Sequence, residues 1–236
     1  AKYVLASEGP FEGFGICGEP TNMGVVYTHG GAVKFKITVT GKASHISRVE
    51  DGVDALSAAV AIYSKIPQIK LTHKKHEVLT ELPKVLVGVL NGGIAAGCIA
   101  PEASMLGDVR TLPDMTRETV YDDLKNLVDE FAVDGCTYKI KLTAVQKSFI
   151  GKKESTLMTA LKNSYKKVRG SEIEVTTKMP TQAFVTETAD MSAIGLEALV
   201  FGPGDWKYLP DEFISIKDMG DAAQIYLNTA YELPLR

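Results

Sequence analysis

The chain reads Val-Lys-Phe-Lys-Ile-Thr-Val-Thr over residues 33–40, with apolar and polar side chains in strict alternation. Successive side chains of a β-strand point to opposite faces, so this alternation predicts a strand with one buried face and one wet face. Residues 84–90 and 104–110 also read as strands, and residues 138–142 alternate again. Helical periodicity lies between the first two strands and between the last two, which predicts a β-α-β-β-α-β order.

Two helices are predicted between these strands. The first begins after Asp51 as N-cap, ends before Pro67, and carries apolar residues on one face, namely Val53, Leu56, Val60 and Tyr63. The second begins after Thr116, ends near Gly135, and carries a similar face of Val120, Leu124, Leu127 and Phe131. The whole order, from about residue 33 to 145, is typical of the ferredoxin-like split βαβ unit. Its sheet has an edge that can pair with a second copy.

The rest of the chain alternates helices with short buried strands. Helices are expected from Ser155 to near Gly170, over about 189–195, and from about Asp218 to Tyr231, and a brief apolar strand over 198–201. This alternation predicts α/β packing, so the fold class is α+β with an α/β part. One or two buried strands do not form a stable parallel sheet alone, and partner strands are therefore expected from outside this tail.

Composition is that of an ordinary globular protein of 236 residues, 45 % of them hydrophobic, with a formal net charge of -3. Such a weak charge disfavours nucleic acid and anionic membranes as partners. The longest apolar runs are far too short to span a bilayer. Three distant cysteines, Cys17, Cys98 and Cys136, disfavour a disulfide framework and favour a reducing, cytoplasmic location.

Residues 13–18 match the Gly-x-Gly-x-x-Gly pattern of dinucleotide-binding loops. That function requires a helix N-terminus directly after the loop, to hold a pyrophosphate. Residues 19–22 read Glu-Pro-Thr-Asn and predict a turn instead. The nucleotide interpretation is therefore disfavoured.

A series of motifs carries more information together than singly. In order they are Gly-Glu-Pro-Thr at 18–21, Thr-His-Gly-Gly at 28–31, Gly-Lys-Ala-Ser-His at 41–45, Gly-Gly at 92–93, Asp-Val-Arg at 108–110, Gly-Pro-Gly-Asp at 202–205 and Pro-Asp-Glu-Phe at 210–213. This order and spacing resemble the zinc-dependent acetylornithine deacetylase, succinyl-diaminopimelate desuccinylase and carboxypeptidase G family of metallopeptidases. The resemblance covers nearly the whole chain.

The resemblance implies a hydrolase that cleaves the amide of an N-acyl amino acid or small peptide with two zinc ions, cobalt being an alternative metal. It makes Glu19 a metal ligand and His45 a catalytic residue that reaches across a homodimer to stabilise the oxyanion. It makes Arg110 the clamp for the substrate carboxylate. Gly202 and Gly204 become a substrate-binding loop where the backbone approaches the ligand closely.

The resemblance also implies a domain arrangement. A ferredoxin-like dimerisation (lid) domain over residues 30–145 is inserted in a partial α/β catalytic-type domain made of residues 1–29 and 146–236. The partners are then a second copy of the chain and a complementing N-terminal half, because the family's other metal ligands have no match before Glu19.

Two further positions depart from the family pattern. Tyr208 stands three residues before Asp211, where the family has a histidine ligand. Gly97 stands near the place of an asparagine expected after the Gly-Gly pair at 92–93.

Three interpretations stay open at this point. In the first, the chain is part of an enzyme and becomes active when the missing metal-binding half is supplied. In the second, it is a non-catalytic dimerisation or binding module descended from the same family. In the third, it is a plain α+β domain with accidental matches, which predicts that His45 and Arg110 lie far from any cleft.

Overall fold

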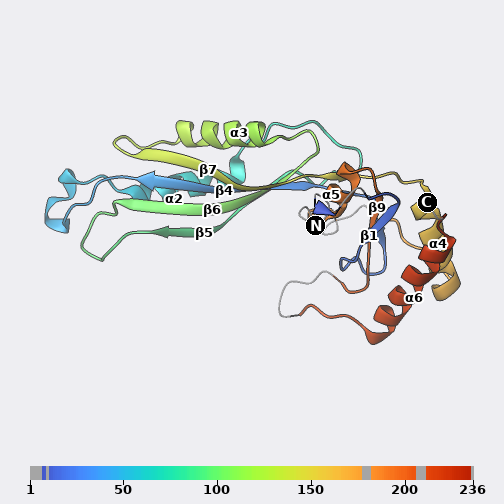
Figure 1. Ribbon diagram of the computed structural model, residues 1–236. Coiled ribbons are helices and arrows are strands. Elements are labelled where there is room, and N and C mark those ends of the chain that lie inside the picture. The colour runs from blue at the N-terminus through green and yellow to red at the C-terminus, as the bar shows by residue number, and fades with distance from the viewer. Residues whose placement is uncertain (1–6, 9–10, 177–181, 206–210, 235–236) are drawn as a thin grey trace. The chain divides into compact units, whose positions relative to one another are not determined.

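The computed structural model describes residues 7–8, 11–176, 182–205 and 211–234. The chain divides into two compact units (Figure 1). Unit 1 comprises residues 1–31, 77–80 and 147–236, and unit 2 comprises residues 32–76 and 81–146. Within the described ranges, no helix has both the length and the hydropathy needed to cross a lipid bilayer.

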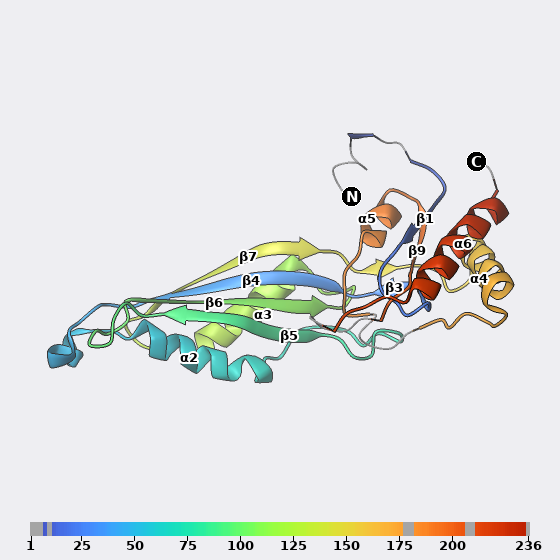
Figure 2. The ribbon, with the colours of Figure 1, turned by 90° about the horizontal axis from the view of Figure 1, so that it is seen from below.

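Unit 2 is built on a four-stranded sheet with the strand order β5-β6-β4-β7. The strands are β4 (Gly31–Thr40), β5 (Lys84–Gly92), β6 (Glu102–Thr111) and β7 (Thr137–Gln146). The β5–β6 and β4–β7 pairs are both antiparallel. With α2 (Ala55–Lys65) after β4 and α3 (Arg117–Glu130) after β6, the ferredoxin-like order predicted from the sequence is confirmed (Figure 2).

The alternation of apolar and polar residues over 33–40 accounts for the packing of β4. Its side chains at 33, 35, 37 and 39 are all buried, whereas Lys34 is exposed. The ring of Phe35 lies so close to Gly107 on β6 that a Cβ there would overlap it. Gly107 is therefore a packing glycine, which lets a large aromatic side chain cross the face of the neighbouring strand.

The prediction for α2 was wrong in its start and its buried face. Asp54, not Asp51, is the N-cap, and its carboxylate accepts from the backbone N–H of Leu56 at 2.9 Å. Residues 46–51 form a short 3₁₀ helix instead. The buried face consists of Ala55, Ala58, Ala59 and Ile62. Small side chains let the helix axis approach the sheet, so the larger Val60 and Tyr63 stay 47 % and 44 % exposed.

Helix α3 follows the prediction at its start and departs from it at its end. Thr116 is the N-cap and forms a capping box with Thr119. The helix stops at Glu130, because Phe131 has left helical backbone geometry at φ -115°. The ring of Phe131 instead receives the Lys65 ammonium 5.1 Å from its centroid.

Unit 1 contains a three-stranded sheet in the order β1-β9-β2. Its strands are β1 (Phe14–Cys17), β2 (Val25–Val26) and β9 (Glu197–Phe201). Strand β9 pairs in parallel with β1 and antiparallel with β2. A second small sheet joins β3 (Thr28–His29) to β8 (Phe149–Ile150). The partner strands that the tail needed are thus found at the start of the chain.

Helices α4 (Thr156–Arg169) and α6 (Ile216–Glu232) contact each other and pack on this sheet, and α5 (Thr188–Ala193) contacts β1 and β9. The shared core includes Met23, Val25, Leu157, Leu161, Leu199, Phe201 and Ile225. The predicted caps of α4 are confirmed, with Ser155 at its start and Gly170 at φ 71° at its end. Helix α6 begins after Ser215, and Asp218 lies in its first turn. There Asp218 forms an ion pair with Arg169 of α4, with 2.7 Å between Oδ1 and Nη1.

Candidate metal site

The segment around Glu19 is a tight turn at the end of β1. The backbone N–H of Glu19 donates to Cys17 O at 3.0 Å, and that of Thr21 donates to Glu19 O at 2.8 Å. The buried hydroxyl of Thr21 donates to Gly24 O at 2.6 Å and accepts from the Gly202 N–H at 3.0 Å. Thr21 therefore ties the turn that carries Glu19 to a loop 181 residues further along the chain.

The Gly202–Gly204 loop lies directly against this turn. Gly202 O accepts from Met23 N at 3.0 Å, and Gly204 O accepts from Asn22 N at 2.7 Å. A Cβ at position 202 would overlap the carbonyl oxygen of Glu19, and Gly204 has φ 88°. Unit 1 thus brings together three of the residues that the sequence nominated, Glu19, Gly202 and Gly204.

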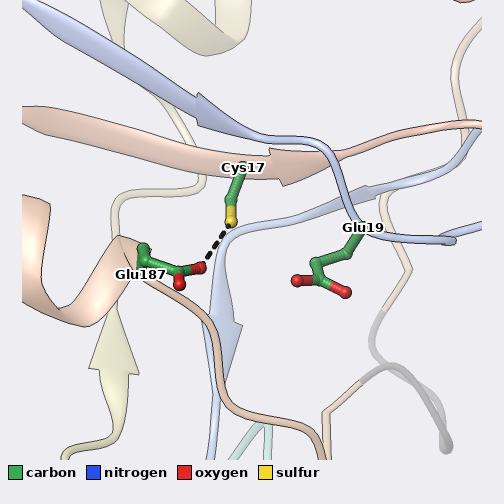
Figure 3. A group of neighbouring side chains, drawn as sticks. All are labelled: Cys17, Glu19 and Glu187. Carbon is green, nitrogen blue, oxygen red and sulfur yellow. Dashed lines mark hydrogen bonds between the residues drawn. The ribbon is translucent and has the colours of Figure 1, made fainter. Parts of the chain in front are cut away.

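Two further side chains join Glu19 in unit 1 that sequence reasoning did not nominate, Cys17 and Glu187. One ligand atom from each of the three lies within 4.8 Å of the other two. The Cys17 thiol donates to Glu187 Oε2 at 3.4 Å, and the Glu19 carboxylate turns toward that of Glu187 (Figure 3). Cys17 is the last residue of β1 and Glu19 follows it in the turn, so the two side chains are neighbours through the turn rather than through the strand repeat. No local pattern marks Glu187.

Burial and mutual repulsion shape the electrostatics of this cluster. Burial raises the pKa of Glu19 above its ordinary value, and the charges of Glu187 and Glu212 raise it further. Burial likewise raises the pKa of the Cys17 thiol to about 11; a hydrogen bond to the Glu187 backbone opposes this rise, and the carboxylates of Glu187 and Glu19 add to it. Carboxylates and a thiol gathered this closely are a donor set that fits a divalent transition metal, whose charge would offset their repulsion.

A buried histidine fixes the backbone beside Glu187. His29 is fully buried, and its Nδ1 lies 2.7 Å from Gly30 O. Because a carbonyl oxygen only accepts, Nδ1 carries the proton and Nε2 accepts from the hydroxyls of Thr186 and Thr188, each at 3.0 Å. Burial lowers the pKa of His29 to about 4, so the ring is neutral near neutral pH. The residues on both sides of Glu187 are thus anchored to one ring.

His45 lies on unit 2, exposed, at the N-cap of the 3₁₀ helix Ile46–Asp51. Its Nδ1 accepts from the Ser47 N–H at 3.2 Å. The neutral ring therefore carries its proton on Nε2, the tautomer that can donate to a developing oxyanion.

Arg110 also lies on unit 2, near the end of β6. Its Nε forms an ion pair with Asp108 Oδ1 at 3.0 Å, and its side chain is 33 % exposed. The guanidinium is thus oriented from one edge by a neighbour on its own strand.

His45 and Arg110 occupy opposite ends of the unit 2 sheet. His45 forms a β-bridge with Cys98, in the turn that joins β5 to β6. Arg110 pairs with Lys84 at the other end of the same hairpin, whereas Gly92 pairs with Ala103 near the turn. Seven residue steps along β6 separate these pairs, which at about 3.3 Å each gives roughly 23 Å. Within one copy of unit 2, these two side chains do not converge on one small ligand.

Two sequence departures fall in different places. Tyr208 lies outside the described residues. Gly97 lies in the turn beside His45, where its carbonyl accepts from the Ile46 N–H at 2.8 Å. Gly97 thus supports the backbone next to His45.

Comparison with known proteins identifies one domain of the chain and several relatives. Residues 27–136 match the model of the M20 peptidase dimerisation domain. A probable succinyl-diaminopimelate desuccinylase of Staphylococcus aureus strain N315 is 26 % identical over 235 residues, covering 86 % of this chain and 56 % of that protein. An acetylornithine deacetylase of Proteus mirabilis strain HI4320 is 26 % identical over 222 residues, covering 92 % of this chain and 55 % of that protein.

A solved structure shares the fold. The M20 family metallo-carboxypeptidase Sso-CP2 of Sulfolobus solfataricus superposes with a TM-score of 0.70 at 15 % identity, over 97 % of this chain and 64 % of that one. The chain thus has the fold of part of a metallopeptidase. It carries an M20 peptidase dimerisation domain and is a homologue of the succinyl-diaminopimelate desuccinylases and acetylornithine deacetylases. It spans little more than half the length of those two relatives.

Proposed function

We propose that this chain forms part of a zinc-dependent amidohydrolase that cleaves N-acyl amino acids or small peptides. The observation that carries the proposal is a contact within unit 1, where the loop of Gly202 and Gly204 is hydrogen-bonded to the turn of Glu19. The proposal keeps residues 1–29 with 146–236 as a catalytic-type domain and residues 30–145 as the dimerisation domain. It places the working protein in the cytoplasm.

The roles of the chain's own residues follow from their chemistry. Two metal ions, zinc or cobalt, would supply Lewis-acid chemistry for amide hydrolysis when bound. Glu19 would hold one of them through its carboxylate, and the remaining ligands would come from a complementing N-terminal half. Arg110 binds the substrate carboxylate through its planar guanidinium. The backbone at Gly202 and Gly204 binds substrate in a place where a side chain would obstruct it.

A homodimer resolves the separation of His45 from Arg110. His45 lies at the turn end of the β5–β6 hairpin and Arg110 at the other end, and roughly 23 Å along β6 separates the ladder pairs at those ends, so one copy does not bring both side chains to a small ligand. In a two-fold symmetric pair, His45 of one copy can reach the ligand bound at Arg110 of the other. The Nε2–H tautomer of His45 then donates to the oxyanion.

Complementation tests the hydrolase proposal directly. The chain is mixed with the N-terminal part of the Staphylococcus aureus relative and zinc, and hydrolysis of N-succinyl-diaminopimelate and N-acetylornithine is measured. We expect activity that Glu19→Gln abolishes and that the exposed-surface control Glu154→Gln retains. Chain that assembles with that half but hydrolyses neither compound, nor a panel of N-acyl amino acids and dipeptides, would refute the proposal in favour of a non-catalytic dimerisation or binding module.

A mixing experiment tests the dimer. His45→Ala and Arg110→Ala chains are each assembled alone and then together in equal amounts. Mixing should restore about a quarter of the wild-type activity, because about half of the dimers are mixed and each of those has one intact site. If both residues act within one copy, the mixture stays inactive.

A further inference from the structure

We propose that Cys17, Glu19 and Glu187 together form a three-ligand metal site, so that this chain by itself binds one divalent transition metal ion through a thiolate and two carboxylates. The inference rests on the proposed function for the presence of a metal at Glu19. It goes beyond that function in the ligands, because the family resemblance nominates Glu19 alone.

The distance between sulfur and oxygen fits a metal that lies between them. Zinc binds thiolates at about 2.3 Å and carboxylates at about 2.1 Å, so two ligands of a tetrahedron lie roughly 3.5 Å apart. Cys17 Sγ and Glu187 Oε2 are 3.4 Å apart, which is that spacing. The third ligand atom, an oxygen of Glu19, lies within 4.8 Å of both. A tetrahedral ion held by these three atoms keeps a fourth corner for water or another ligand.

The binding step balances in protons and charge. The incoming M²⁺ replaces the thiol proton of Cys17, which leaves as H⁺, and the Cys17 sulfur becomes a bound thiolate. The hydrogen bond from the thiol to Glu187 is lost and both atoms become ligands. Three anionic ligands then surround a doubly charged cation. A thiolate in the set favours zinc or cobalt over magnesium or calcium, which prefer oxygen ligands alone.

The backbone around the three ligands is held in place without the metal. Cys17 is paired with Val200 in the parallel β1–β9 ladder. Glu19 lies in the turn that Thr21 ties to Gly202. Glu187 lies between two threonines whose hydroxyls bond the buried ring of His29. Metal sites depend on such supporting hydrogen bonds to orient their ligands.

Cobalt binding tests the site without any activity assay. The full chain is titrated with Co²⁺, and the thiolate-to-cobalt charge-transfer absorption in the near ultraviolet is recorded together with stoichiometry by equilibrium dialysis. We expect one ion per chain and a charge-transfer band. Cys17→Ser should abolish the band, and Glu187→Gln should weaken binding by more than about tenfold, since even partners outside the ligand shell contribute that much. Cys98→Ser and Cys136→Ser are the matched controls and should keep the band.

The cobalt titration would overturn the site in either of two ways: a wild-type chain with no charge-transfer band, or a band that survives Cys17→Ser. Far-ultraviolet circular dichroism checks that each variant is folded. X-ray absorption of the zinc-loaded wild type gives a second measurement, because one sulfur neighbour at about 2.3 Å is expected. A zinc spectrum with oxygen and nitrogen neighbours only would overturn the site even if every variant misfolded.

This test fails separately from the hydrolase test. A chain that shows the Cys17-dependent band but no hydrolysis with the complementing half supports the site and refutes the activity. Hydrolysis that needs Glu19, in a protein whose cobalt spectrum does not change with Cys17, supports the activity and overturns the site.

Discussion

Acid should destabilise unit 1 through His29. The perturbation is a fall in pH from about 7 to about 4, with His29→Gln as the comparison chain, because glutamine is polar but does not titrate in this range. The imidazole is fully buried, with the rings of Phe149 and Phe184 at 5.5 and 5.9 Å between centroids. Burial lowers its pKa to about 4, from an ordinary value of 6.5.

The sign and size follow from proton linkage. Because the folded state has the lower pKa, the unfolded chain binds more protons between pH 6.5 and about 4. The contribution of His29 to stability is complete above pH 6.5, falls as the pH drops, and levels off below about 4. At about 1.4 kcal/mol for each tenfold change in proton affinity, the loss is on the order of 3 kcal/mol.

Hydrogen exchange of the buried amides of Leu199 and Val200 on β9 reports the unfolding free energy of unit 1 across this pH range. We expect the wild type to lose on the order of 3 kcal/mol more than His29→Gln between pH 7 and 4. The same pH slope in both chains would refute the reasoning. So would a His29 imidazole NMR resonance that titrates near 6.5 in the folded protein.

Two further predictions concern close packing. Thr21→Val should destabilise unit 1 by about 1–3 kcal/mol, because the buried Gly202 N–H loses its acceptor, whereas Thr21→Ser should keep most of the stability. Urea denaturation, followed by hydrogen exchange of the β9 amides, measures the stability of both variants. Equal losses in the two variants would contradict the hydrogen-bond account. Gly107→Ala should destabilise unit 2 by about 1–3 kcal/mol through overlap with the Phe35 ring. In thermal melts, the double variant with Phe35→Leu should recover part of that loss. A double variant whose loss is the sum of the two single losses would contradict the packing account.

The sequence could predict the elements whose signals are local. Alternation in β4 needs only the two-residue repeat of a strand, and the Ser155 and Gly170 caps of α4 act within one helical turn. The face of α2 could not be obtained this way. A count of large apolar residues predicts that Val60 and Tyr63 lie on the buried face. In the structure the buried face instead carries the small alanines at 55, 58 and 59, which fit between the helix and the sheet. That preference is set by tertiary packing, which overrides a count of hydrophobicity.

The candidate site divides along the same line. Glu19, Gly202 and Gly204 could be nominated because each lies in a short motif that resembles the metallopeptidase family. Glu187 lies in no such motif and reaches Cys17 across 170 positions of sequence. It arrives there because β9 inserts between β1 and β2, and α5 contacts both β9 and β1. Such an approach depends on the order of strands in the sheet, which local patterns do not encode.

The hydrogen bonds of unit 1 also indicate which of the three ligands should move when a metal binds. The turn of Glu19 is fixed by backbone contacts to residues 202 and 204, and Cys17 is fixed by strand pairing. Glu187 is the exposed member, and its carboxylate already accepts from the thiol that a metal would deprotonate. The two ligands near the start of the chain therefore form a preorganised pair, and Glu187 closes on it. Preorganisation of this kind lowers the ordering cost of binding. The affinity for the metal should therefore depend on the hydrogen bonds of Thr21, even though Thr21 itself does not ligate the metal.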